Sequence, residues 1–190
     1  MAPLTLVIGN KNYSSWSLRP WLFMKHVGLE FQEILIPLDT LETHEQIDHY
    51  TPSGRVPVLQ QGTLCVWDSL AICEYLAELS GKGWPQAREA RARNRRTAIT
   101  AALEADIERV DEIWNDCRGR FGGGGPWLFG DYSVADAMYA PVVLRFNTYG
   151  ARISQTARWY IASVLEDAPL QEWLQAAKQE PWTIAADEVG

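Results

Sequence analysis

Residues 55–79, RVPVLQQGTLCVWDSLAICEYLAEL, predict a β-hairpin that leads directly into a helix. Two short runs rich in β-branched residues, Val56–Leu59 and Leu64–Val66, flank a tight turn at Gly62. Over residues 69–79 the apolar side chains instead recur every three or four positions, as they do on one face of a helix. The stretch therefore predicts the last three elements of a small α/β domain.

Upstream of this stretch the sequence predicts two more strands and two more helices. The apolar, β-branched runs at residues 4–8 and 31–36 are typical of strands. A helical pattern from about residue 16 ends at Gly28, and a short polar helix covers residues 42–50. The predicted order over residues 1–80 is therefore β-α-β-α-β-β-α.

Downstream, residues 80–85 have the composition of a linker, and no strand signal of comparable quality follows them. Helical patterns instead cover residues 98–117, 134–148, 155–166 and 169–179. The sequence therefore predicts an all-α C-terminal domain over residues 86–190.

The composition excludes several classes of protein. The chain has 47% hydrophobic and 22% charged residues, which is typical of a globular protein, and no apolar run approaches the ~20 residues of a membrane helix.

Its three cysteines, Cys65, Cys73 and Cys117, are odd in number and never spaced as CxxC, which indicates a reducing compartment rather than a disulfide scaffold or a zinc site. The three histidines have no metal-ligand spacing, so no metal is expected. A net charge of −7 argues against a nucleic-acid partner. The first residues have no basic region followed by an apolar core, so no secretory signal is expected.

Four motifs follow one another along the chain: YSSWSLR at 13–19, RVPVL at 55–59, WDSLAI at 67–72 and LFGDYSVAD at 128–136. In this order, and with these elements, the chain resembles the cytosolic glutathione transferases over nearly its whole length. Within them it is most similar to the serine-type classes, above all the zeta class of maleylacetoacetate isomerase-like enzymes. The resemblance implies a thioredoxin-like N-terminal domain, glutathione as co-substrate, a cytoplasmic location and a homodimer.

The first motif is similar to the Ser-Ser-Cys-Ser-x-Arg segment of the zeta class. The resemblance implies that the Ser14 hydroxyl donates a hydrogen bond to the glutathione thiolate, with Ser15 as its nearby substitute. A helix N-terminus favours negative charge and lowers a thiol pKa from its usual ~8.5. The alternative is that both serines only cap the helix. Trp16 stands where the zeta class has cysteine, which disfavours thioltransferase chemistry through a protein cysteine.

The second motif holds the proline that thioredoxin-like folds have in the cis form. A cis Val56–Pro57 bond would turn the backbone of Val56 toward the cysteinyl part of glutathione, which would pair with it as a short antiparallel strand. The alternative is an edge-strand proline with no ligand. Arg55 is a candidate for a carboxylate contact, although an exposed loop arginine needs no such role.

The third motif opens the predicted helix with an acid and a serine. In the family the equivalent pair binds the γ-glutamyl end of glutathione. The helix N-terminus and the Ser69 hydroxyl favour a carboxylate, and Asp68 can accept from the α-ammonium group. The alternative is that the pair only caps the helix.

The fourth motif is predicted to serve structure rather than chemistry. Ser133 and Asp136 have the spacing of a capping box with its acid at the third helical position. The chain also departs from the family where the arginine-rich residues 87–96 run directly into the helical pattern that follows. About one helix is absent near residues 96–97, through either a deletion or a segment left out of the numbering.

The sequence thus predicts a glutathione transferase that activates the thiolate for attack on a small electrophile, as in detoxification. One alternative is a glutathione-dependent cis–trans isomerase of the maleylacetoacetate type. Another is a noncatalytic binding or assembly module with the same fold. The expected homodimer gains support from charge, because residues 1–80 carry four Lys or Arg against nine Asp or Glu, and a basic cluster follows at residues 88–96.

Overall fold

A four-stranded sheet lies at the centre of the N-terminal part of this computed structural model, which describes residues 2–85, 103–185 and 187. Its strands are β1 (Leu4–Ile8), β2 (Phe31–Leu35), β3 (Val58–Gln61) and β4 (Leu64–Trp67), in the order β2-β1-β3-β4. The pair β1–β2 is parallel, whereas β3 runs antiparallel to both β1 and β4. The predicted hairpin is therefore confirmed as β3 and β4.

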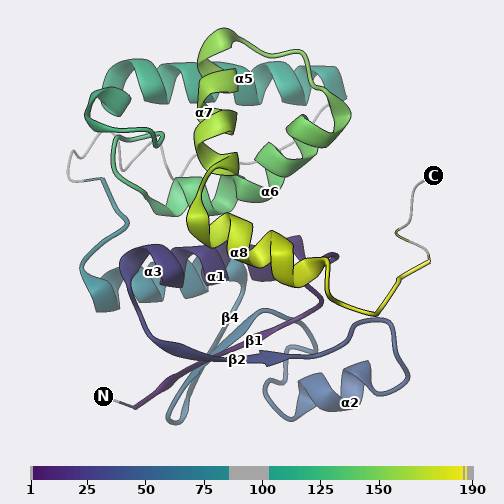
Figure 1. Cartoon of the computed structure of the whole chain (residues 1–190). Coiled ribbons are helices and arrows are strands. Elements are labelled where there is room, and N and C mark those ends of the chain that lie inside the picture. Colours follow the sequence, from purple (N-terminus) through teal and green to yellow (C-terminus); the bar gives the residue numbers. More distant parts are fainter. Residues whose placement is uncertain (1, 86–102, 186, 188–190) are drawn as a thin grey trace. The chain divides into compact units, whose positions relative to one another are not determined.

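Three helices cover this sheet, with α1 (Ser15–Val27) and α3 (Ser69–Ser80) on one face and α2 (Thr43–Asp48) on the other (Figure 1). The first helix ends at Gly28, whose φ of 77° is the left-handed conformation that glycine adopts at low cost. The element order confirms the predicted thioredoxin-like α/β domain.

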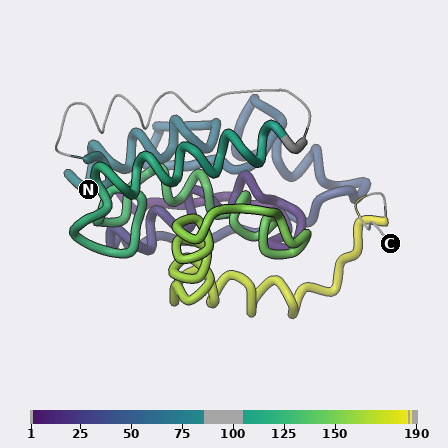
Figure 2. The backbone as a smooth tube through the Cα atoms, turned by 90° about the horizontal axis from the view of Figure 1, so that it is seen from above, coloured from purple at the N-terminus to yellow at the C-terminus, as the bar shows by residue number. Residues whose placement is uncertain are grey.

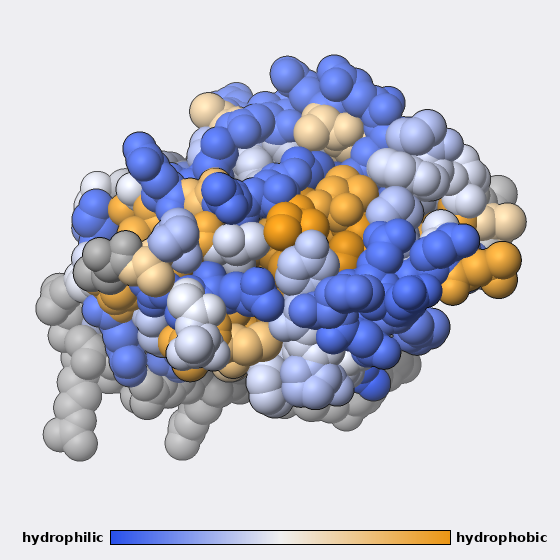
Figure 3. All heavy atoms as spheres, turned by 90° about the horizontal axis from the view of Figure 1, so that it is seen from below, coloured by the Kyte–Doolittle hydropathy of each residue, from blue (hydrophilic) through white to orange (hydrophobic). Residues whose placement is uncertain are grey.

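The apolar core of this domain lies on both faces of the sheet. Under α2, the side chains of Val7, Ile36, Ile47 and Val58 form one buried cluster. The central strand β1 is almost entirely apolar because both of its faces are covered, as is usual for a strand inside an α/β layer. Figure 3 views the molecule from below the orientation of Figure 1, and most of this surface is hydrophilic around smaller exposed apolar areas.

The following part of the chain is helical, as predicted. It contains α5 (Leu103–Phe121), a short 3₁₀ turn (Gly122–Gly124), α6 (Val134–Tyr149) and α7 (Gln155–Leu165). Figure 2 shows α5 as one continuous helix. The only β-type pairing in the described part of residues 82–168 consists of isolated bridges near residues 127–131.

An aromatic cluster and one buried carboxylate hold this helical unit together. The indole of Trp114 is fully buried and contacts the rings of Tyr139, Phe146 and Tyr160 at centroid distances of 5.5, 5.4 and 4.9 Å. The Asp136 carboxylate reaches back to the N–H of Ser133 at 2.9 Å, which confirms the predicted capping box.

The last helix, α8 (Ala168–Ala177), marks a difference from the predicted division of the chain. The structure separates into one unit of Met1–Gly81 with Pro169–Gly190 and a second unit of Lys82–Ala168. The C-terminal segment groups with the sheet domain because the ring of Trp173 packs on Trp21 of α1 at 5.2 Å. After α8 the chain forms no further regular element up to Ala185 (Figure 2).

The predicted shortening near residues 96–97 and the basic cluster at 88–96 lie outside the described residues. Among the helices that the structure describes, none is long and apolar enough to cross a membrane.

Candidate functional site

A pocket of about 300 Å³ opens at the N-terminus of α3. Its volume is at the lower end of the range for small-molecule sites. Five of the seven predicted site residues line it, namely Arg55, Val56, Pro57, Asp68 and Ser69. Three residues that the prediction did not include line it as well: Trp16, Ser53 and Trp67. The two predicted serines of the α1 start are not among the lining residues, although the neighbouring Trp16 is.

The wall formed by residues 55–57 has the predicted backbone shape, because the Val56–Pro57 peptide bond is cis. Pro57 and Val58 are buried, whereas Val56 is half-buried at the pocket. Outside the helices and strands, none of the backbone hydrogen bonds among the described residues involves Val56. Its peptide groups are therefore suited to pair with an extended ligand backbone.

Asp68 caps α3 in an unusual conformation, with a φ of 77°. A positive φ is uncommon for a residue other than glycine, and such conformations cluster at functional sites. Its Oδ1 accepts hydrogen bonds from the N–H groups of Leu70 at 2.8 Å and Ala71 at 3.3 Å. Among the described residues Oδ2 accepts none, so one carboxylate oxygen is left for a cationic group.

Ser69 provides the most informative polar atom of the pocket. The residue is only 2% exposed, and its Oγ is buried without a hydrogen-bond partner among the described residues. A buried hydroxyl without a partner loses about 1–3 kcal/mol, so such groups are rare unless a ligand or water completes them. Here the hydroxyl lies in the first turn of a helix, where the helix dipole favours an anion.

The two serines at the start of α1 differ in their surroundings. Ser14 is buried and caps the helix, because its Oγ accepts from the N–H of Ser17 at 3.3 Å and donates to the Ser17 Oγ at 2.7 Å. The Ser17 Oγ in turn accepts from the N–H of Gly9 at 3.2 Å. Ser15 is half-buried at the first helical position. The capping interpretation is therefore correct for Ser14, and a role toward a thiolate stays a prediction for both serines.

Two tryptophans form aromatic walls of the pocket that the sequence-based site did not include. Trp16 and Trp67 are 55% and 49% exposed, although indole rings are usually covered. The guanidinium of Arg19, one turn along α1, lies 3.8 Å from the centroid of the Trp16 ring and thus supports one face of it. The sequence feature that could have indicated an aromatic wall is Trp16, which stands at the position where the zeta class has cysteine.

A second hollow of about 380 Å³ adjoins the first and shares Arg55 and Val56 with it. Its other wall comes from the chain around α2, including Thr40, Thr43 and His44. Arg55 is exposed and lies in both hollows, so its side chain is available to a carboxylate from either side.

The described residues that line the pocket include no cysteine and no histidine. The described residues contain no group of three or more His, Cys, Asp or Glu side chains that could hold a metal ion. Cys73 lies on α3, but it is fully buried, and burial raises the pKa of its thiol far above the usual range. That thiol therefore stays protonated and inert.

Residues 13–79 match the glutathione S-transferase N-terminal domain, and residues 100–176 match the glutathione S-transferase C-terminal domain. Dichloromethane dehalogenase from Methylorubrum extorquens is 38% identical over 30% of this chain and 20% of its own length. Protein LigF from Sphingobium sp. is 28% identical over 64% of this chain and 44% of its own length. The chain thus spans less than half the length of these curated relatives.

Solved structures show the same fold over more than nine-tenths of the chain. A glutathione transferase homolog from Burkholderia gl BGR1, with bound glutathione, has a TM-score of 0.74 at 22% identity and covers 94% of this chain and 100% of its own. An unclassified glutathione S-transferase from Bombyx mori has a TM-score of 0.73 at 20% identity and covers 93% and 94%. The N-terminal and C-terminal domain models match the chain one after the other, and the fold is the one that the resemblance predicted. The chain therefore belongs to the glutathione S-transferase family.

Proposed function

We propose that this protein is a glutathione transferase that activates the thiolate of glutathione for attack on a small electrophile. The observation that carries the proposal is the buried Ser69 Oγ, which has no hydrogen-bond partner among the described residues and lies in a pocket at a helix N-terminus. A ligand group that accepts from the hydroxyl would complete this site, and the helix dipole favours an anionic one. The family and the glutathione-bound structural neighbours point to the γ-glutamyl carboxylate as that group.

The remaining pocket residues have chemistry that matches the rest of the tripeptide. The open Oδ2 of Asp68 suits the α-ammonium group, beside the carboxylate that Ser69 would bind. The backbone of Val56 suits the cysteinyl peptide groups, and Arg55 suits the glycyl carboxylate. Binding along this line would direct the cysteinyl sulfur to the part of the pocket that Trp16 lines.

The start of α1 would then favour the ionised sulfur. A helix N-terminus stabilises negative charge, and a serine hydroxyl there can donate to it. Ser14 would need to turn its hydroxyl away from Ser17, whereas Ser15 has no such bond to break. In the reaction the thiolate forms a carbon–sulfur bond, the leaving group departs with its electron pair, and the thiol proton passes to solvent.

The class of electrophile is a separate part of the proposal. The match to dichloromethane dehalogenase extends over 58 residues, and it supports small halogenated substrates as one candidate class. The first motif, YSSWSLR at residues 13–19, is the basis for assigning the protein to the serine-type and zeta-like classes. The isomerase alternative depends on the same motif. Trp16 disfavours a thioltransferase because an indole cannot form a mixed disulfide.

Replacing each serine tests the mechanism. Ser14→Ala is expected to lower turnover about tenfold to a hundredfold, with a smaller change in the half-saturating glutathione concentration, because a hydrogen bond to a charged group contributes ~1.5–3 kcal/mol. Turnover would be measured with an aryl halide and with a cis-diketo acid, which separates conjugation from isomerisation. Full activity in Ser14→Ala with loss in Ser15→Ala reassigns the role, and full activity in both removes this mechanism.

We also propose a homodimer that forms around β4 and the start of α3. Leu64, Trp67 and Leu70 in this region are 43%, 49% and 43% exposed, which leaves apolar area that a second copy would cover. Light scattering at micromolar concentration checks this. A mass near twice 21.5 kDa supports the dimer, and a mass near 21.5 kDa contradicts it.

A further inference from the structure

The loop between β1 and α1 determines where the two serines lie. The N–H groups of Tyr13 and Ser14 both donate to the carbonyl of Asn10, at 3.1 and 2.8 Å. The turn is therefore tight, and it leads directly into the first residue of the helix. A displacement of Lys11 or Asn12 inside this turn is transmitted to Ser14 and Ser15.

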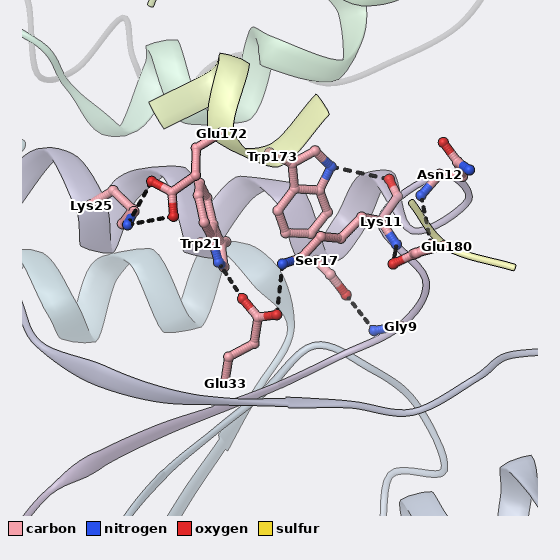
Figure 4. A network of polar contacts seen from close by, with 10 residues as sticks. All are labelled: Gly9, Lys11, Asn12, Ser17, Trp21, Lys25, Glu33, Glu172, Trp173 and Glu180. Carbon is pink, nitrogen blue, oxygen red and sulfur yellow. Dashed lines mark hydrogen bonds and ion pairs between the residues drawn. The ribbon is translucent and has the colours of Figure 1, made fainter. Parts of the chain in front are cut away.

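The C-terminal segment contacts this loop through the Glu180 carboxylate. Glu180 Oε1 accepts from the N–H of Lys11 at 2.8 Å, and Oε2 accepts from the N–H of Asn12 at 3.4 Å. Hydrogen bonds to an ionised carboxylate are stronger than those between neutral groups, and two at once fix orientation as well as distance. The segment that carries Glu180 has no regular structure of its own, so these bonds are not a by-product of helix packing (Figure 4).

Four further contacts hold Lys11 and Asn12 in place. The Trp173 Nε1 donates to the carbonyl of Lys11 at 3.0 Å, and the Asn12 Nδ2 donates to the carbonyl of Ala177 at 2.9 Å. The Lys11 ammonium pairs with Glu33 at 2.6 Å and lies over the ring of Trp173 at 5.2 Å. The N–H, the carbonyl and the side chain of Lys11 therefore each have a partner. The partners of the N–H and the carbonyl, Glu180 and Trp173, lie more than 160 positions further along the chain.

We infer that Glu180 and Trp173 are positioning residues for thiolate activation. They act through Lys11 and Asn12 and fix the turn that presents Ser14 and Ser15 to the sulfur. The inference rests on the proposed glutathione transferase function. Correct placement of an activating group is worth a large factor in rate, and a misplacement of about 1 Å can cost about a hundredfold.

The test uses the full chain with Glu180→Ala, Glu180→Gln and Trp173→Phe. Glu180→Ala removes both bonds to the loop, Glu180→Gln keeps one acceptor oxygen, and Trp173→Phe keeps an aromatic ring while losing the bond to Lys11. Glu172→Ala is the matched control, because Glu172 lies on α8, shortly before Glu180 in the chain. Among the described residues it forms an ion pair with Lys25 and no hydrogen bond with the loop. Each is assayed with glutathione and an aryl halide across pH, alongside thermal unfolding.

Glu180→Ala is expected to lower kcat about tenfold and to move the pH–rate midpoint and the ultraviolet titration of bound thiolate to higher pH, with KM for glutathione within about twofold. Glu180→Gln and Trp173→Phe should fall between this variant and the wild type, and Glu172→Ala should match the wild type. A wild-type pH profile in Glu180→Ala, or an equal loss in Glu172→Ala, overturns the inference while leaving the proposed function standing.

Two other outcomes are also decisive. If Glu180 acted only as a nearby negative charge, its removal would move the pH–rate midpoint to lower pH, which contradicts positioning. If the wild-type protein does not ionise or conjugate glutathione at all, the proposed function fails and this inference fails with it. Should Glu180→Ala not fold, Glu180→Gln and Trp173→Phe carry the same comparison.

Discussion

The N-termini of α3 and α6 contain the same residue types, an acid and a serine, but the hydrogen bonding of these residues differs. At α6 the Asp136 carboxylate accepts from the N–H of Leu128, the N–H and Oγ of Ser133, and the hydroxyl of Tyr160, all within 3.1 Å. At α3 Asp68 is exposed with a positive φ, and the buried Ser69 Oγ has no partner among the described residues.

The Asp136 carboxylate is a polar group that stabilises the fold, whereas the proposed function assigns the Ser69 hydroxyl to a ligand. A buried network stabilises when every member is satisfied, and a half-satisfied one is costly. At α6 the cost of burial is visible in the Asp136 carboxyl, whose pKa is raised by burial although its four hydrogen bonds act to lower it. At α3 the corresponding cost falls on the Ser69 hydroxyl, to which the proposed function assigns the γ-glutamyl carboxylate.

The largest expected effect is on stability, from Asp136→Ala. This change leaves the N–H groups of Leu128 and Ser133 and the hydroxyl of Tyr160 buried without an acceptor. Each such group costs about 1–3 kcal/mol, so the free energy of unfolding should fall by about 3 kcal/mol or more. Urea unfolding measures this, with Asp131→Ala at an exposed position as the control. A loss below about 1 kcal/mol would show that the network contributes little.

A smaller effect is expected from Ser133→Ala, which removes one hydroxyl from the same network. The loss should be about 1 kcal/mol, because the Asp136 carboxylate keeps its other three donors. Glutathione affinity should not change, since Ser133 belongs to the unit formed by residues 82–168 rather than to the pocket. Unchanged melting together with a sharp fall in affinity would reverse the roles assigned to the two helix starts.

The sequence was sufficient for features that depend on neighbouring residues. The capping box at Ser133 and Asp136 and the hairpin of β3 and β4 follow from short-range patterns, and the structure confirms both. The cis bond before Pro57 was expected from the resemblance to thioredoxin-like folds, and it is confirmed as well. The grouping of Arg55, Val56, Asp68 and Ser69 at one pocket followed from the resemblance, because the order of elements brings these two loops to one end of the sheet.

Features that depend on distant residues were not visible in the sequence. The contacts of Trp173 and Glu180 with the loop at Lys11 join positions more than 160 residues apart, and neither residue stands in a recognisable motif. The helical pattern of α8 indicated a helix but not the unit that it packs on. In the same way, the pattern Asp68-Ser69 reads as a helix cap, and only the surroundings of its Oγ distinguish it from Ser133.

The most direct test of this account is a calorimetric titration of glutathione into the wild type, Ser69→Ala and Ser133→Ala. The wild type should bind, and Ser69→Ala should bind about tenfold to a hundredfold more weakly, because a hydrogen bond to a carboxylate contributes ~1.5–3 kcal/mol. Its melting temperature should stay level or rise, since the change removes a buried hydroxyl that has no partner in the described part of the chain. Ser133→Ala should bind as the wild type does. Equal affinity in Ser69→Ala and the wild type, or no binding by the wild type, would contradict the account.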